Sequence, residues 1–386
     1  MKGDPSVSTL PSRAIVAPPK PDPGGALRIA QVAPLAESVP PARYGGTERV
    51  VAYLSEALAA LGHQVTLFAS ADSTAAVERV ACCPRALRTD PAACEPDLWA
   101  VMQLHQLLDD CERFDIVHFH SGYLHFLLAD RLPPHLTTLH GRLDRDPQAF
   151  YARHPSPLVS ISAAQRAPLP QANWAGTVHH GLPRDLLRPG PGGGGYLAFV
   201  GRLSREKRID AAIEIARRAG RPLKIIAKVD PADSAYVERE VRPLLDEAGV
   251  EFRGEGDERA KNELLGGAEA LVFPIDWPEP FGLVMIEALA CATPVIAFRR
   301  GSVPEIVEHG RTGFVVDSVD EAVAAVARLG EIDRAACRRA FEERFVAERM
   351  ARDYVRIYRD LLERRPAPAA AASRMQEVPS WPRHPP

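Results

Sequence analysis

The chain of 386 residues carries a formal net charge of −3, with 46% hydrophobic and 25% charged residues. This length allows two domains with large cores, and so small a charge argues against general binding to nucleic acid or to an acidic membrane surface. No apolar run reaches the about 18 residues typical of a membrane-spanning helix, and residues 1–25 lack the apolar core of a secretory signal. The six cysteines form no C-x-x-C pair, so we expect reduced thiols and a cytoplasmic protein.

The first half of the chain alternates short apolar runs with helical patterns. Residues 1–26 are rich in proline and predict a disordered tail. The expected strands are 27–33, 64–69, 114–120, 136–140, 158–161 and 177–180, and the expected helices are 50–61, 98–108 and 124–132. A strand, a turn at Gly45-Gly46, a helix and a second strand begin a Rossmann-like sheet. Residues 27–186 are therefore expected to form one α/β domain.

The glycine- and proline-rich segment 188–195 is the clearest linker. After it the alternation resumes, so residues 187–345 predict a second Rossmann-like domain. Its expected strands are 196–200, 223–227, 250–252, 270–273, 294–297 and 314–316, and the final helices are expected at 332–344 and 346–362. Residues 366–386 predict a second disordered tail. Two such domains joined by a hinge place a ligand cleft at the carboxyl ends of both sheets.

Two carboxylates flank the start of one predicted helix. Residues 277–290 read Trp-Pro-Glu-Pro-Phe-Gly-Leu-Val-Met-Ile-Glu-Ala-Leu-Ala, which places Glu279 in the preceding loop and Glu287 about one turn inside the helix. Gly282 allows close approach of backbone to a ligand, and the first N–H groups of a helix form an anion site. An anion site between two acids suits a sugar nucleotide, with hydroxyl groups at each acid and the diphosphate between them.

A basic segment follows the first strand of the second domain, with Arg202 and Lys207 at the carboxyl end of that strand. Arg202 can grip a phosphate through two hydrogen bonds, and Lys207 can add a point charge. The alternative is a solvated basic turn, but the helix start expected opposite favours diphosphate binding. Gly45-Gly46 could approach a phosphate as well. It is not a G-x-G-x-x-G motif, which argues against a nicotinamide dinucleotide.

Several histidines end neighbouring predicted strands. His118 and His120 alternate on one strand and therefore face the same side, and His140 ends the next strand. Three histidines could bind a metal ion, but no fourth ligand or supporting carboxylate is evident, so hydrogen bonding to sugar hydroxyls fits better. The pair His179-His180 has no assigned role. Glu305 is expected to cap a helix, and Asp144 with Asp146 is a weak candidate for a metal–nucleotide site.

Taken together, these segments resemble the retaining glycosyltransferases of family 4, of bacterial type, which have the GT-B fold. The resemblance covers residues 27–362. It is carried by the E-x7-E spacing of Glu279 and Glu287, by Gly-Arg-Leu-Ser-Arg-Glu-Lys at 201–207, and by three further segments at 44–48, 115–120 and 301–313.

The resemblance implies a role for each matching residue. Glu279 would bind hydroxyls of the transferred sugar and Glu287 the ribose, while the backbone of Phe281, Gly282 and Leu283 would hold sugar and phosphate. Arg202 and Lys207 would neutralise the leaving diphosphate, Gly45 and Gly46 would approach it from the first domain, and His120 would bind the sugar near its 6-hydroxyl with His118 and His140 close by. Lys228 replaces a Gly-x-Gly turn common in such domains and is expected near phosphate or base, so the nucleotide is not predicted.

The resemblance also implies the architecture and the reaction. The first domain would present the acceptor, the second would bind the donor, and the helix at 346–363 would cross back to the first domain. The expected activity is retaining transfer of a hexose-type sugar without a metal or cofactor. The acceptor is left open as a sugar, a lipid-linked molecule or a small molecule, as is peripheral membrane contact. The alternatives are a GT-B nucleotide-sugar epimerase and a non-catalytic nucleotide-sugar-binding protein.

Overall fold

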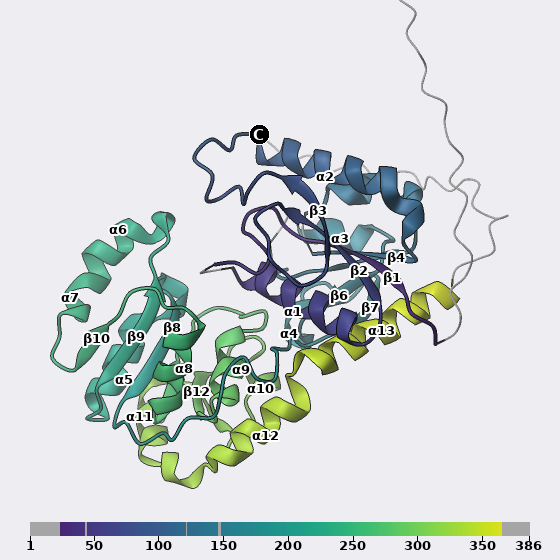
Figure 1. The fold of residues 1–386 in the computed structure, drawn as a ribbon. Coiled ribbons are helices and arrows are strands. Elements are labelled where there is room, and N and C mark those ends of the chain that lie inside the picture. The colour runs from purple at the N-terminus through teal and green to yellow at the C-terminus, as the bar shows by residue number, and fades with distance from the viewer. Residues whose placement is uncertain (1–23, 43–44, 121, 146–147, 365–386) are drawn as a thin grey trace, which may run out of the picture.

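The computed structural model describes residues 24–42, 45–120, 122–145 and 148–364 (Figure 1). The tails predicted at 1–26 and 366–386 lie outside these residues apart from 24–26, as do Arg43, Tyr44 and Asp146. Figure 1 shows two α/β lobes, one coloured purple to teal and the other mostly green, with the yellow C-terminal helix running from the second to the first. The predicted pair of Rossmann-like domains is confirmed.

The first domain is built on a parallel sheet with the strand order β3-β2-β1-β4-β5-β6-β7. Its strands are β1 (Arg28–Val32), β2 (Gln64–Ser70), β3 (Glu78–Cys83), β4 (Ile116–Phe119), β5 (His135–Thr138), β6 (Leu158–Ser160) and β7 (Trp174–Thr177). Its helices are α1 (Gly46–Ala60), α2 (Pro96–Asp110), α3 (Ala149–Arg153) and α4 (Ala163–Arg166), with 3-10 turns η1 (Cys111–Arg113) and η2 (Leu124–Arg131). The central strands are apolar and buried on both faces, as parallel strands between helices must be.

The second domain has a parallel sheet with the order β10-β9-β8-β11-β12-β13. Its strands are β8 (Leu197–Arg202), β9 (Leu223–Lys228), β10 (Val250–Phe252), β11 (Ala270–Phe273), β12 (Val295–Phe298) and β13 (Gly313–Val316). Its helices are α5 (Ile209–Arg218), α6 (Ser234–Tyr236), α7 (Arg242–Leu245), α8 (Glu258–Gly267), α9 (Leu283–Ala290), α10 (Val303–Ile306), α11 (Val319–Ala327) and α12 (Arg334–Arg344), with 3-10 turns η4 (Arg205–Lys207), η5 (Pro231–Asp233) and η7 (Leu329–Glu331) and a short π-helix η6 (Val237–Val241). The last described helix is α13 (Ala347–Glu363).

Two predictions differ from the first domain as observed, and strand β3 and the short helices α3 and α4 were not predicted. The helix expected at 124–132 is instead the 3-10 segment η2. Here the ring of His125 stacks on that of Phe119 with ring centres 3.9 Å apart, and its Nε2 is hydrogen-bonded to Thr137 Oγ1 at 2.8 Å. These contacts with neighbouring strands hold the segment in place. The edge strand β3 was missed, since its first two residues are charged and exposed and only the short run 80–83 is apolar. The last strand lies at Trp174–Thr177 rather than 177–180, so His179 and His180 follow it.

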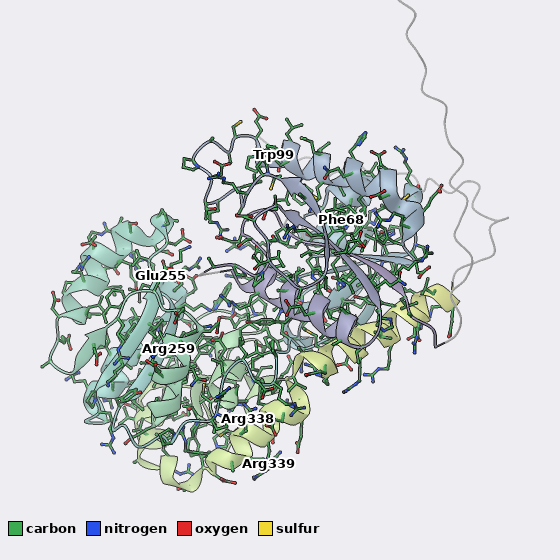
Figure 2. All side chains as sticks on the ribbon, in the orientation of Figure 1. Phe68, Trp99, Glu255, Arg259, Arg338 and Arg339 are labelled. Atoms are coloured by element: carbon green, nitrogen blue, oxygen red, sulfur yellow. The ribbon has the colours of Figure 1, made fainter. Side chains whose placement is uncertain are left out.

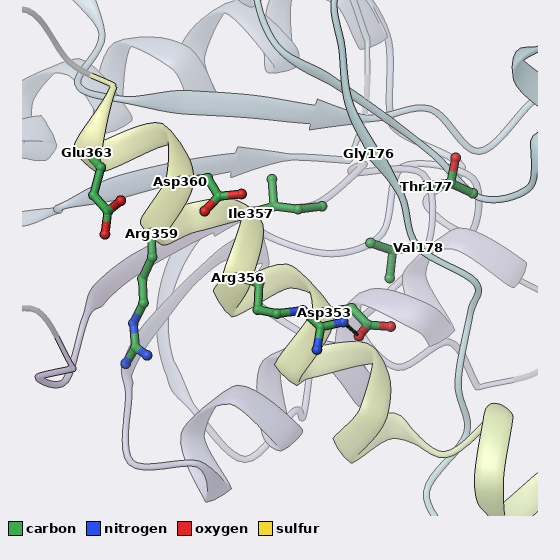
Figure 3. A pocket seen from close by; sticks show the side chains of 9 residues that line it. All are labelled: Gly176, Thr177, Val178, Asp353, Arg356, Ile357, Arg359, Asp360 and Glu363. Carbon is green, nitrogen blue, oxygen red and sulfur yellow. Dashed lines mark hydrogen bonds and ion pairs between the residues drawn. The ribbon is translucent and has the colours of Figure 1, made fainter.

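The helix α13 crosses to the first domain, where it packs on α1. Its fully buried Tyr358 bonds to His118 Nδ1 at 2.7 Å, and its Tyr354 bonds to Thr138 at 2.9 Å. A cavity of about 510 Å³ lies between this helix and β7, where Arg356 pairs with Asp353 (Figure 3). No described helix is long and apolar enough to cross a membrane.

The segment that leads into the linker is tied to α12 and α9 through backbone carbonyl groups. Arg338 of α12, labelled in Figure 2, donates hydrogen bonds to the carbonyls of Arg184 and Leu187 and to that of Ala290, at 2.8 to 3.0 Å. The domains also touch directly, because Ser162 Oγ donates to the carbonyl of Pro280 at 2.6 Å. These contacts set how the two sheets face each other.

Candidate active site

A cavity of about 640 Å³ opens between the two domains. Its walls come from the carboxyl ends of β8, β9 and β11, from the start of α1 and from the loop that leads into α9. The predicted site residues among its lining are Gly45, Gly46, His140, Arg202, Lys207, Lys228, Glu279, Phe281, Gly282, Leu283 and Glu287. The topology therefore brings together nearly all the residues singled out from the sequence, at the position expected for parallel sheets.

Glu279 lies deep in this cavity, with 9% of its side chain exposed. Its carboxylate forms a short ion pair with Lys207 and accepts a hydrogen bond from Trp277 Nε1 at 2.9 Å. The Lys207 ammonium also lies 5.0 Å from the centre of the Trp277 ring. A carboxylate and a cation are thus held side by side where β11 and the 3-10 turn η4 end.

The start of α9 is open to the cavity. Gly282 is its N-cap, with φ of 76°, and no side chain caps the helix. A Cβ at this position would meet Met285 Cε at 2.8 Å and Glu279 Cγ at 3.3 Å, so glycine is needed for conformation and for space. Across the cavity, Gly46 faces Leu283, and a Cβ on Gly46 would lie 3.8 Å from Leu283 Cδ1. The first N–H groups of α9 can therefore bind an anion.

The basic wall lies opposite α9 and contains Arg202 and Lys228. Arg202 pairs with Glu206 at 2.5 Å and approaches Asp233 at 3.5 Å, and burial raises the pKa of Asp233. Lys228 lies 4.0 Å from Asp230. Arg202 and Lys228 line the same cavity as the acids, and so does Lys207 from the basic segment, so these cations face the cavity.

The three predicted histidines lie at different distances from the cavity, and only His140 lines it. His118 and His120 do face the same side, with ring centres 3.9 Å apart, but they lie behind the cavity wall. His118 is fully buried and bonds to Tyr358 and to Thr138 Oγ1, each at 2.7 Å. His120 bonds to Gln31 at 2.7 Å and to His140 at 3.1 Å. Direct contact of His118 and His120 with a ligand, as predicted, therefore needs correction, because their ring nitrogens already have partners.

His140 is the histidine of this set that lines the cavity. Its Nδ1 has no hydrogen-bond partner among the described residues, and burial lowers its pKa to about 3. His180, to which the sequence assigned no role, also lines the cavity and stacks on His140 at 5.3 Å. Within the described residues, no three His, Cys, Asp or Glu side chains are grouped to hold a metal ion.

Other side chains at the site were missed from the sequence. Lys261 and Arg49 line the cavity and form ion pairs with Glu287 and Glu258, respectively. Each lies about one turn inside an observed helix, α8 and α1 respectively, and a charged residue there gives only a weak signal in the sequence, since it is usually solvated. Glu305 caps a helix, as expected, but this helix is α4 of the first domain. Its carboxylate accepts hydrogen bonds from the N–H groups of Ala163 and Ala164 at 2.8 Å and lies 3.1 Å from His179 Nε2.

Comparison with known proteins agrees with this geometry. A family model for glycosyl transferases group 1 matches residues 189–344, and one for glycosyltransferase family 4 matches residues 44–179. The alpha-maltose-1-phosphate synthase of Mycolicibacterium smegmatis is 33% identical over 154 residues, which cover 38% of each chain. The N-acetyl-alpha-D-glucosaminyl L-malate synthase of Bacillus anthracis is 34% identical over 147 residues, covering 36% of this chain and 38% of the relative. The matched stretches thus span under half the length of these relatives.

Solved structures match over more of the chain. AviGT4, a glycosyltransferase involved in avilamycin A biosynthesis, has a TM-score of 0.67 and 26% identity over 88% of this chain and 99% of its own. Anabaena HepE in complex with UDP-glucose shares the fold, with a TM-score of 0.66 at 16% identity over 86% of this chain and 100% of its own. With two family models that together match both domains, this chain belongs to glycosyltransferase family 4 and has the GT-B fold.

Proposed function

We propose that this protein is a retaining glycosyltransferase that moves a hexose-type sugar from a nucleoside diphosphate to an acceptor hydroxyl. The observation that carries the proposal is the single cavity in which the open start of α9 lies between two buried acids and faces a basic wall. Membership of family 4 and the likeness to the glycosyltransferase AviGT4 support it.

In this proposal the cavity holds the donor along its length. Glu279 accepts hydrogen bonds from hydroxyls of the transferred sugar, and Glu287 accepts them from the ribose. The backbone of Phe281, Gly282 and Leu283 holds the diphosphate at the start of α9, close to Gly45 and Gly46 from the first domain. Lys228 lies at the nucleotide end of the basic wall.

The sugar contact first expected for His120 is proposed for His140 instead. His140 lines the cavity and His120 does not, and both ring nitrogens of His120 are engaged, whereas the buried Nδ1 of His140 has no partner among the described residues. His120 then positions His140 from behind. With a pKa of about 3, His140 is neutral near pH 7, so it serves as a hydrogen-bonding group rather than as a cation.

The bond that breaks joins the anomeric carbon to the diphosphate. Negative charge grows on the leaving phosphate, and Arg202, Lys207 and the N–H groups of α9 are positioned to stabilise it, the kind of effect that is often the largest in catalysis. The acceptor attacks from the same face, and the leaving phosphate helps to remove its proton. This mechanism needs no protein base and no metal ion.

A direct test combines ligand screening with two substitutions. A thermal-shift screen of UDP-, GDP- and ADP-sugars should show one nucleotide class that stabilises the protein. Glu279→Gln and Lys207→Met should then lower kcat for sugar transfer by about 100-fold or more. Because each leaves half of a buried ion pair, the melting temperature of each variant is measured as well.

Matched controls are Glu269→Gln and Lys224→Met, since Glu269 pairs with Arg221 and Lys224 with Glu251 away from the cavity. These variants should keep full activity. Full activity of folded Glu279→Gln and Lys207→Met would rule out the proposed roles. Turnover of the sugar nucleotide without an acceptor, giving an epimer, would favour an epimerase, and binding without turnover would favour a binding protein.

A further inference from the structure

A lysine is buried in the cavity wall beside the acid proposed to bind ribose. Lys261 lies about one turn inside α8, with 11% of its side chain exposed. Its Nζ lies 2.6 Å from Glu287 Oε1 and 3.0 Å from Glu258 Oε2. Burial acts to lower the pKa of Lys261, but the two carboxylates outweigh it and the pKa is raised. The side chain is therefore a charged ammonium held between two acids.

This contact restrains Glu287. The Glu287 side chain is 7% exposed and has three rotatable bonds, so by itself it could turn within the cavity. A charge-assisted hydrogen bond of 2.6 Å holds one of its oxygens at a defined place. A binding group is effective when a neighbouring contact already holds it in the productive position.

The contacts continue from Glu258 to the first domain. Arg49, one turn inside α1, forms a short ion pair with Glu258, and their side chains are 12% and 27% exposed. Arg49, Glu258, Lys261 and Glu287 thus form a line of alternating charge, which we call the ion chain. It runs from the first helix of one domain to the second acid of the E-x7-E pair in the other.

We propose that Lys261 is the positioning residue for Glu287, and that the ion chain couples ribose binding to docking of α1 against the second domain. The inference rests on the proposed function, because Glu287 must bind the ribose. Glu279 and Glu287 by themselves do not connect the nucleotide site to the first domain, whereas the ion chain does. Lys261 need not touch the nucleotide for this role.

The test uses ribose recognition as its readout. Calorimetry measures the Kd of the wild-type protein for UDP and for 2′-deoxy-UDP, or for the GDP or ADP pair if that nucleotide binds. Wild-type protein should prefer the ribonucleotide by about tenfold, since one hydrogen bond to a charged group is lost in the deoxy form. Lys261→Met should lose this preference, and Lys261→Arg should keep part of it.

A purely structural role would have a different signature. If Lys261→Met binds both nucleotides more weakly but keeps the preference, the positioning role is overturned. Lys261→Arg, which keeps the charge, answers the question if Lys261→Met does not fold, and unchanged preference in Lys261→Arg and Lys261→Gln would also overturn it. Lys224→Met is the matched control and should bind like wild type. Failure of wild-type protein to bind any of the three diphosphates would instead overturn the proposed function, and this inference with it.

The link to the first domain is tested by a double-mutant cycle of Arg49→Met and Glu258→Gln. If the ion chain transmits the effect, Arg49→Met weakens nucleotide binding several-fold in the wild-type background and has little further effect beside Glu258→Gln. An equal loss in both backgrounds would show that Arg49 acts on the nucleotide directly, and the coupling would be wrong.

Discussion

At the scale of single residues, Gly282 shows how backbone and site depend on each other. Its φ of 76° lies in the left-handed region, and a Cβ there would meet side chains of Met285 and Glu279. Both constraints act at the open end of α9, where the proposed diphosphate binds. Any side chain at this position strains the turn, clashes with Met285 and crowds Glu279.

The substitution Gly282→Ala should therefore destabilise the fold by about 1–3 kcal/mol and weaken donor binding. Gly310→Ala is a close control, because Gly310 has nearly the same φ of 78° but open space around its Cα. Urea unfolding and nucleotide titration measure both effects. Equal losses of stability and equal nucleotide affinities in Gly282→Ala and Gly310→Ala would contradict the prediction, because the close contacts at Gly282 would then affect neither stability nor binding.

At the scale of elements, α13 joins the two domains through buried hydroxyl groups. The Tyr358 hydroxyl bonds to His118 Nδ1 at 2.7 Å and accepts a hydrogen bond from Gln31 Nε2 at 3.2 Å. Gln31 in turn bonds to His120, which bonds to His140 at the cavity. The last helix of the chain thus supports the histidine side of the site from behind.

Tyr358→Phe removes this hydroxyl and leaves two buried polar groups without a partner, at an expected cost of about 2 kcal/mol or more. Thermal unfolding should show a lower midpoint for this variant. Tyr236→Phe, on the half-exposed helix α6, is the control and should leave the midpoint unchanged. Equal midpoints for both variants would mean that water or rearrangement replaces the lost bonds.

At the scale of the whole molecule, buried histidines link stability to pH. Burial is the main cause that lowers the pKa of His125 and His140 to about 3 and that of His118, His120 and His180 well below 6.5. At His125 and His140 the unfolded chain then binds more protons than the folded one between about pH 3 and pH 6.5, and at the other three it does so as the pH falls below 6.5. Stability from these groups is present above pH 6.5 and is lost as the pH falls through this window.

We expect the unfolding free energy to fall steeply below pH 6.5, by up to about 1.4 kcal/mol per pH unit for each such histidine. His125→Gln should reduce this slope by about one such increment, because His125 is buried away from the cavity. His105→Gln, with a side chain 77% exposed, serves as the surface control. Denaturant unfolding at pH values from 7 to 4 measures the slope of unfolding free energy against pH. The same slope for His125→Gln and for wild type would contradict the prediction.

Local patterns were enough to predict most of the architecture. Apolar runs such as 270–273 place buried strands within a residue or two, and glycine turns with amphipathic runs place α1, α9 and α13. The motif around Glu279 and Glu287 then predicts an anion site, because a helix start depends only on residues near it in the chain. Edge strand β3 and the 3-10 segment η2 escaped, since contacts from elsewhere decide their conformation.

The sequence by itself therefore determined the two α/β domains, the family resemblance and most of the cavity lining. Only the tertiary structure decided which histidines line the cavity and which cation holds Glu287. His140 stands in front of His120, and Lys261 reaches Glu287 from a helix 26 positions earlier. The physical reason is that helix starts and apolar periodicity are local, whereas ion pairs and burial depend on how distant segments pack. No spacing along the chain encodes the ion pair between Arg49 and Glu258, which forms only when the two domains meet.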